Sequence, residues 1–172
     1  MKITLEKWFG ALEKTAARLK DKQVTYNRHG SRAGKIRRKG TTNCVGYVME
    51  SLYSIGLLKK GGAFWLGRKI HGKSAKRLHK DQRFKILYRK EKLRDARLKP
   101  GDIVGLQWGP GLFNKVHTLV YYGEQGGQKL FYSFGPAQSG NWETGPMPKP
   151  EYDNRTLYVI IRIRDIDREI IS

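Results

Sequence analysis

Apolar side chains recur every three or four residues in two segments near the N-terminus, and this spacing predicts two amphipathic helices. The first covers residues 4 to about 20, with Lys and Glu opposite the apolar face. The second covers residues 44–56, where Thr41 or Thr42 offers an N-cap oxygen and Gly56 a stop. Because the first helix has one apolar face, its expected role is packing.

The rest of the chain changes to short apolar runs bounded by Gly and Pro, which predicts strands joined by turns. A tight turn at residues 98–102 begins one strand, and residues 123–127 connect two others as a hairpin. Because helices come first and an antiparallel meander follows, the predicted fold class is α+β, in one domain covering residues 1–172. The expected strands are residues 84–88, 103–108, 116–122, 129–134 and 156–163, with a short extended piece at 24–27. The other expected segments are loops at 28–40 and 136–154, an aromatic turn at 61–67 and a short helix at 75–80.

Positive charge points to a class of partner. The chain has 35 Lys and Arg against 15 Asp and Glu, a net charge of +20. Because so many like charges repel one another, a polyanionic partner is expected: nucleic acid, an anionic membrane or the teichoic-acid-bearing bacterial wall. The charge concentrates in residues 28–39 and 68–99, although a solvated face accounts for part of the second stretch. The residues expected to bind the wall or another polyanion are Lys76, Arg77, Lys80 and Arg83.

The cysteine count and the N-terminal pattern argue against disulfide-bonded, zinc-binding, membrane-spanning and secreted proteins. A single cysteine excludes an intramolecular disulfide and a cysteine-based zinc site. No spacing such as His-Glu-x-x-His is present, so neither a metal nor a cofactor is expected. No segment resembles a membrane span, and Met1-Lys2-Ile3 leads into an amphipathic helix rather than a secretory signal. We therefore expect a monomer made in a cytoplasm.

Two residues suggest nucleophilic chemistry. Cys44 lies where the second helix is expected to begin, and the positive end of a helix dipole favours the nucleophilic thiolate. His117 stands at the head of an apolar strand, so the two supply the halves of a cysteine-nucleophile site. A lone cysteine is also often a small buried hydrophobe, and position alone leaves both interpretations open. The other histidines are expected on the surface: His29, His71 and His79.

Three motifs together resemble the NlpC-type and CHAP-type cell-wall cysteine hydrolases. Residues 42–48, Thr-Asn-Cys-Val-Gly-Tyr-Val, look like the nucleophile motif of these families. Residues 98–104, Leu-Lys-Pro-Gly-Asp-Ile-Val, resemble the Pro-Gly-Asp turn that begins the strand before the catalytic histidine. Residues 117–123 are similar to the histidine strand, and residues 130–133 to the strand after it. Order and spacing agree over most of residues 26–134.

The resemblance implies a reduced papain-like core, in which the cysteine helix packs on an antiparallel sheet. It implies that Cys44 attacks an amide carbonyl, while His117 holds the thiolate as an ion pair and then protonates the leaving amine. The third position, usually a polar residue that orients the histidine, falls near Ser133. The following loop offers Asn141 or Glu143 as alternatives.

Two further residues take roles from the same resemblance. Tyr26 is similar to a tyrosine that lies near the oxyanion in relatives, although an ordinary core aromatic is an equal alternative. Asn43 is the polar residue before the nucleophile, and we assign it to positioning. Residues 64–67, Phe-Trp-Leu-Gly, most resemble small amidase-like proteins of Gram-positive bacteria and their phages.

The implied activity is peptidoglycan hydrolysis at an amide, either within the stem peptide or between stem and sugar. Without a signal peptide, such an enzyme would reach the wall through a phage holin, in a virion or after lysis, and an endolysin is the simplest version. Two alternatives stay open. One is a nucleic-acid-binding protein, although no helix-turn-helix, zinc-finger or RRM signature is present. The other is a toxin or deamidase that uses Cys44 and His117 on a protein substrate.

Overall fold

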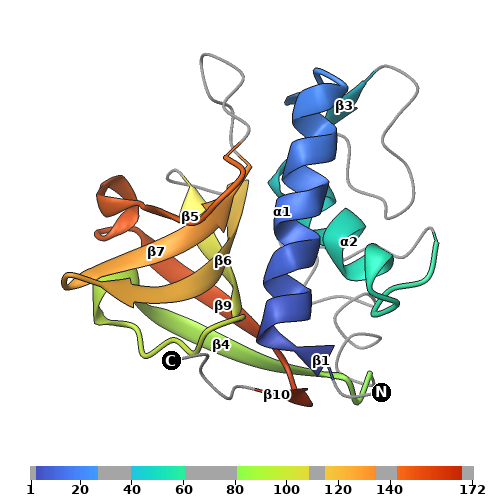
Figure 1. Cartoon of the computed structure of the whole chain (residues 1–172). Coiled ribbons are helices and arrows are strands. Elements are labelled where there is room, and N and C mark those ends of the chain that lie inside the picture. The colour runs from blue at the N-terminus through green and yellow to red at the C-terminus, as the bar shows by residue number, and fades with distance from the viewer. Residues whose placement is uncertain (1–2, 27–39, 61–80, 109–114, 135–142, 168–172) are drawn as a thin grey trace.

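The computed structural model describes residues 3–26, 40–60, 81–108, 115–134 and 143–167. Within them, two helices lie side by side against one face of a six-stranded antiparallel sheet (Figure 1). The predicted α+β class is therefore confirmed. None of the helices in these residues combines the length and apolar character that crossing a membrane requires.

Helix α1 (Leu5–Asp21) agrees with the first predicted helix. Thr4 caps it, because its side-chain oxygen accepts a hydrogen bond of 3.1 Å from the Lys7 backbone N–H. The apolar face buries Trp8, Leu12 and Leu19 completely. This face packs on helix α2 (Cys44–Ser54) and on the sheet, as the helical periodicity predicts.

Helix α2 begins at Cys44 as predicted, but the prediction of a threonine N-cap is wrong. Asn43 caps the helix, and its side-chain oxygen accepts a 2.7 Å hydrogen bond from the Gly46 N–H. The two threonines instead form strand β3 (Thr41–Thr42), which pairs in parallel with β2 (Thr25–Tyr26). The helix ends before Gly56, whose φ of +78° suits a glycine.

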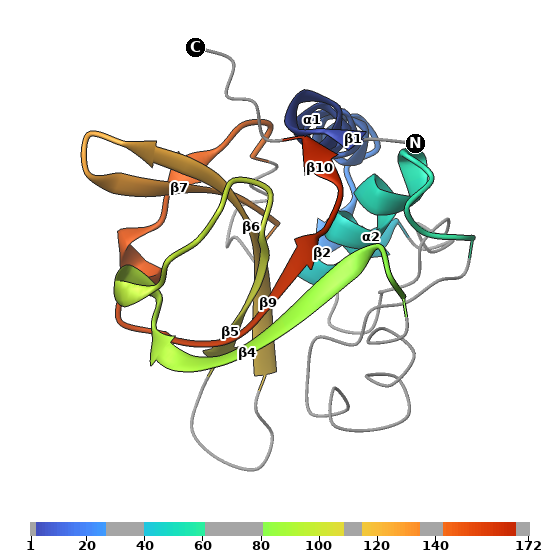
Figure 2. The ribbon, with the colours of Figure 1, turned by 90° about the horizontal axis from the view of Figure 1, so that it is seen from below.

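The sheet has the strand order β4-β9-β5-β6-β7-β8. Its consecutive strands β5, β6 and β7 form the first part of the predicted meander, but the last predicted strand does not continue it. Strand β9 inserts between β4 and β5 (Figure 2), because its apolar residues are buried on both faces and need a central place. The strands are β4 (Phe84–Lys92), β5 (Ile103–Trp108), β6 (Lys115–Gln125), β7 (Gln128–Ser133), β8 (Met147–Pro148) and β9 (Thr156–Ile163). A separate parallel pair joins β1 (Ile3–Thr4) and β10 (Ile166–Asp167).

Several boundaries differ from the sequence-based expectation. Strand β6 runs on through the expected connection, so the hairpin turn is only Gly126-Gly127, both with positive φ, between paired Gln125 and Gln128. Strand β4 continues to Lys92 past a bulge. The long loop expected at 136–154 contains β8 and a 3-10 turn η3 (Pro150–Tyr152). The segments expected at residues 28–39, 61–67 and 75–80 lie outside the described residues.

The sheet has apolar side chains on both faces, which separates two cores. Val120, Tyr132 and Val159 belong to the core beneath the helices. Leu119 and Phe131 lie on the other face, in a second cluster that a second 3-10 turn, η2 (Leu93–Asp95), and η3 help to cover. Consecutive residues of β6 therefore point to opposite faces of the sheet and into different cores. The same alternation decides which of its polar side chains point toward the helices and which point away from them.

The Pro-Gly-Asp turn fixes the start of β5. The carboxylate of Asp102 is fully buried and accepts two hydrogen bonds from Arg162, of 2.7 and 2.6 Å. It also accepts a 2.8 Å hydrogen bond from the Lys99 N–H. Gly101 has a φ of +87°, and a Cβ there would lie 3.0 Å from Leu5 Cδ2. The turn therefore needs both its glycine and its carboxylate.

We expect Asp102→Ala to lower the free energy of unfolding by about 3–5 kcal/mol, because it leaves the Arg162 charge unpaired in a largely buried place. Urea unfolding followed by circular dichroism measures the loss. Asp95 is the matched control, since its ion pair with Arg94 is exposed on both sides, and Asp95→Ala should cost less than about 1 kcal/mol. Equal effects of the two substitutions would contradict a structural role for the turn.

Candidate functional site

Cys44 is the first residue of α2, and its side chain is only 3% exposed. Four groups interact with its sulfur: the backbone and hydroxyl of Thr118, the Tyr26 hydroxyl and the Val45 backbone. Thr118 directly follows His117 on β6, and its backbone nitrogen is bonded to the carbonyl carbon of His117. The helix start thus brings the thiol to the beginning of the predicted histidine strand.

Burial sets the protonation state of this thiol. Removal of the sulfur from water raises the pKa of Cys44 above its ordinary value of 9.0, and this effect is larger than the lowering by Thr118, Tyr26 and Val45. The expectation of a thiolate, drawn from the helix start alone, is therefore wrong for the resting site. A neutral thiol surrounded by hydrogen-bond donors can form a thiolate once a base accepts its proton.

His117 lies on β6 opposite Leu106 and is 6% exposed. Its Nε2 is 3.4 Å from the Ser133 hydroxyl oxygen, so the predicted proximity of the two side chains is observed. The contact is diagonal across the strands, because the direct partner of Ser133 is Leu119. The ring also meets the edge of the Tyr152 ring, with centroids 5.3 Å apart.

The imidazole is uncharged at neutral pH. Burial, followed by the positive charge of Lys149, lowers the pKa of His117 to about 4. Lys149 also forms an ion pair with Glu143, one of the two alternatives for the third residue. The other alternative, Asn141, lies outside the described residues. Of the three candidates for the third residue, Ser133 is the one that contacts His117 Nε2 within the described part of the chain.

Cys44 and His117 approach the same end of β6 from different sides. His117 shares a face with Leu106 and Leu119, which is the face turned away from the helices. Thr118 shares the opposite face with Val120, and it is Thr118 that the sulfur touches. The resting site is thus a neutral thiol beside the backbone that carries a neutral imidazole, rather than a preformed ion pair.

The two predicted positioning residues have distinct surroundings. Tyr26 is half-buried, its hydroxyl interacts with the Cys44 sulfur, and its ring stacks on Phe134 with centroids 6.1 Å apart. Asn43 is buried and uses its side-chain oxygen to cap α2. Tyr26 therefore contacts the Cys44 sulfur directly, whereas Asn43 fixes the start of the helix on which Cys44 lies.

Of the four residues predicted to bind polyanions, only Arg83 lies within the described residues; Lys76, Arg77 and Lys80 do not. The Arg83 guanidinium donates two hydrogen bonds to Asp81, of 2.8 and 2.6 Å, and lies over the Phe84 ring. Part of its charge is thus already neutralised by a neighbour. Binding of a polyanion by these four residues stays a prediction.

Sequence reasoning missed three residues of the site: Thr118, Tyr152 and Lys149. Thr118 carried a usable signal, because it is a polar side chain at a position of β6 that alternation turns toward the helices. Tyr152 and Lys149 carried none. Both lie in a segment that reads as a loop, and only the pairing of β8 with β7 brings it beside His117.

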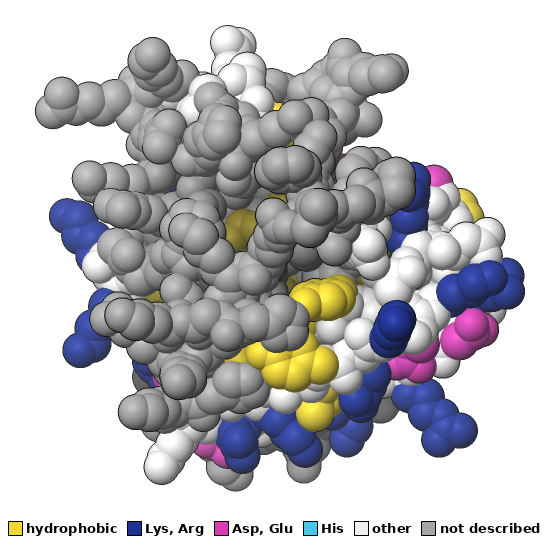
Figure 3. All heavy atoms as spheres, turned by 180° about the vertical axis from the view of Figure 1, so that it is seen from behind, with side chains coloured by type: hydrophobic (Ala, Val, Ile, Leu, Met, Phe, Trp, Pro, Cys, Tyr) yellow, Lys and Arg dark blue, Asp and Glu magenta, His cyan; other side chains and the backbone are white. Residues whose placement is uncertain are grey.

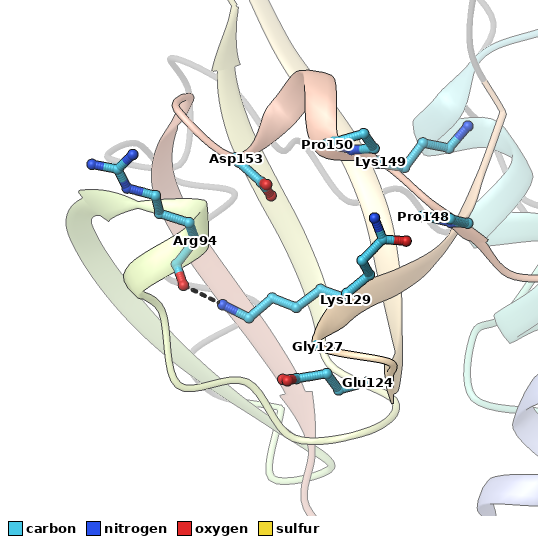
Figure 4. A pocket seen from close by; sticks show the side chains of 9 residues that line it. Arg94, Glu124, Gly127, Lys129, Pro148, Lys149, Pro150 and Asp153 are labelled. Carbon is cyan, nitrogen blue, oxygen red and sulfur yellow. Dashed lines mark hydrogen bonds between the residues drawn. The ribbon is translucent and has the colours of Figure 1, made fainter.

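A polar cavity of about 210 Å³ lies on the outer side of the β6–β7 hairpin. In Figure 4, Lys129 crosses it and donates a 2.6 Å hydrogen bond to the carbonyl of Arg94, while the Lys149 side chain points away. Glu124 and Asp153 also line it. No three His, Cys, Asp or Glu side chains of the described segments converge on a point that could hold a metal ion.

If Cys44 and His117 catalyse the amide hydrolysis that the sequence resemblance implies, we expect Ser133→Ala to lower the turnover number by about 10-fold to 100-fold with little change in KM, because a neutral hydroxyl would orient the imidazole without touching substrate. Steady-state kinetics on a soluble peptide containing such an amide would measure both constants. Ser51→Ala provides the control, since Ser51 is also buried but donates to the Tyr47 carbonyl within α2. Full activity of the Ser133 variant would assign the orientation of the ring to another group.

Comparisons with protein-family models, with curated proteins and with solved structures found no significant match. What the site can do therefore follows from its own side chains. A buried thiol at a helix start, hydrogen-bond donors around its sulfur and an imidazole held by a hydroxyl are the parts that acyl transfer through a cysteine requires.

Proposed function

We propose that this protein is a cysteine amidohydrolase of bacterial peptidoglycan with a reduced papain-like core. The observation that carries the proposal is the meeting of Cys44, at the first turn of α2, with the start of β6, which carries His117 next to Ser133. Chain order, nucleophile first and histidine strand second, agrees with the NlpC-type and CHAP-type resemblance. The α+β architecture supports the same assignment.

In the proposed reaction, His117 accepts the thiol proton and the Cys44 sulfur attacks the carbonyl carbon of an amide. The tetrahedral intermediate collapses as the carbon–nitrogen bond breaks, and His117 gives the proton to the leaving amine. Water then attacks the thioester, with His117 as base, and releases the acid and the free thiol. Because Nε2 contacts Ser133, the nitrogen that exchanges protons with the sulfur is Nδ1.

The neutral resting pair is compatible with this chemistry. A general base must be uncharged to accept a proton, and a His117 with a pKa of about 4 is uncharged over the whole physiological range. Catalytic hydrogen bonds often tighten only when substrate binds, so the thiol and the ring need not touch at rest. Substrate would also cover the sulfur with a polar group, which reduces the effect of burial on the thiol.

Charge supports a polyanionic wall as the place of action. The exposed side chains of edge strand β4 include Lys85, Arg89, Lys90 and Lys92. In the rear view, Lys and Arg side chains gather along the lower border, beside a small group of hydrophobic side chains (Figure 3). Such a surface attracts anionic teichoic acids over a range that becomes shorter as the salt concentration rises. The chemistry at Cys44 acts at short range and does not depend on this attraction.

Digestion of purified peptidoglycan followed by mass spectrometry of the soluble fragments tests the proposal. The expected result is a new amine and a new carboxylate at one type of amide bond, either in the stem peptide or at the stem–sugar junction. The Cys44→Ser protein, purified identically, excludes contaminating hydrolases. Intact peptidoglycan would overturn the proposal, and tight salt-dependent binding of duplex DNA or RNA would then favour the nucleic-acid alternative.

A further inference from the structure

The Thr118 hydroxyl is a buried polar group beside the Cys44 thiol. Thr118 is 1% exposed, and its Oγ1 forms no hydrogen bond of ordinary geometry in the resting structure. The residue directly opposite on β5 is Gly105, which has no side chain to offer a partner. A buried hydroxyl without a partner lowers stability, so its presence here needs a reason.

The position of this hydroxyl supplies the reason. Thr118 faces the helices, and both its backbone and its hydroxyl interact with the Cys44 sulfur. A threonine hydroxyl can rotate to donate its proton to an anion. While the sulfur is a neutral thiol, it is a poor acceptor and leaves the hydroxyl poorly bonded. A thiolate is a strong acceptor and would capture the same hydroxyl.

We propose that Thr118 is a thiolate-stabilising residue, whose hydroxyl donates to the Cys44 sulfur only when the sulfur is negatively charged. The proposal rests on the proposed function in taking Cys44 as the nucleophile. The Thr118 and Val45 backbone groups and the Tyr26 hydroxyl stabilise the same charge, so the Thr118 hydroxyl adds a further donor to this set. An interaction made only with the charged form lowers the energy needed to activate the thiol.

The rate of alkylation by iodoacetamide between about pH 6 and pH 11 measures the thiol directly. Across this range His117, with a pKa of about 4, is neutral, and Tyr152, whose pKa burial raises to about 12, is protonated, so neither contributes to the profile. We expect Thr118→Val, which keeps the shape and removes the hydroxyl, to move the profile upward by about one pH unit. Thr118→Ser should restore the wild-type profile.

Two controls separate this role from packing. Thr15→Val alters another buried threonine, which is not among the contacts of Cys44, and it should leave the profile unchanged. The melting temperature of Thr118→Val should equal or exceed that of the wild type, because the substitution removes an unpaired hydroxyl from the core. If the valine variant failed to fold, Thr118→Ala compared with Thr118→Ser would give the same contrast.

The outcomes distinguish this proposal from the proposed function. A shifted alkylation profile without any wall hydrolysis by the wild type supports Thr118 and overturns the peptidoglycan substrate. Wall hydrolysis by the wild type with an unshifted profile in Thr118→Val overturns the role of Thr118. An unshifted profile in Thr118→Val but a shifted one in Tyr26→Phe would assign stabilisation of the thiolate to Tyr26 instead.

Discussion

Replacing Cys44 with serine is expected to abolish peptidoglycan hydrolysis, while the protein stays folded. An alcohol of ordinary pKa is a far weaker nucleophile than a thiolate at neutral pH. The side chain is small, so the change costs little packing at this 3% exposed position. Release of soluble muropeptides measures activity, and near-ultraviolet circular dichroism together with the melting temperature measures folding.

Chemical modification tests the same residue without mutation. Cys44 is the only cysteine in the chain, so a single carboxamidomethyl group should appear by mass spectrometry and should remove activity in proportion. Because burial raises the thiol pKa, modification should be slow at neutral pH and should accelerate as the pH rises. Chelators should have no effect. A Cys44→Ala protein that retained full activity would exclude the cysteine mechanism.

Much of the fold could be predicted because its local signals and its packing agree. The apolar periodicity of α1 and the two glycines of the β6–β7 turn each specify one local structure, and the structure has both. The place of β9 could not be predicted, since a strand that is apolar on both faces shows that it is central but not which neighbours it has. The N-cap of α2 could not be predicted either, because three adjacent residues, Thr41, Thr42 and Asn43, all have side chains that can cap a helix. In the structure Asn43 is the N-cap.

In the candidate site, the positions of some side chains could be predicted from the sequence, whereas the protonation states could not. Alternation along two paired strands was enough to bring Ser133 to the face of His117. Alternation also places Thr118 toward the helix that carries Cys44, although the resemblance directed attention to the histidine alone. The protonation states could not be predicted, because the helix dipole is visible in the sequence whereas burial is a property of the whole fold.

His117→Ala is expected to lower the rate of peptidoglycan hydrolysis by about 10³-fold or more, since it removes the group that we propose to accept the thiol proton and pass it to the leaving amine. Binding of peptidoglycan should change little. His71→Ala is the matched control, because His71 lies in the basic stretch for which we predict a surface role, and it should be nearly fully active. An equal loss at His71 would show that the Cys44–His117 pairing is wrong.

The same substitution should change the dependence of stability on pH. In the folded protein the pKa of His117 is about 4, below its ordinary value of 6.5, so the unfolded chain binds a proton more readily. The stability that comes from the neutral buried ring is complete above pH 6.5 and is lost as the pH falls through 4. This loss amounts to roughly 3 kcal/mol.

Urea unfolding at about pH 7 and pH 4 measures this loss for each protein. In His117→Ala the drop in unfolding free energy should be smaller than in the wild type by that amount, whatever the absolute stability of the variant. Because the difference between two pH values cancels the packing cost of the substitution, it reports the buried imidazole alone. Identical drops in the two proteins would mean that folding leaves the pKa of His117 near its ordinary value of 6.5, which would contradict a buried imidazole whose pKa is lowered to about 4.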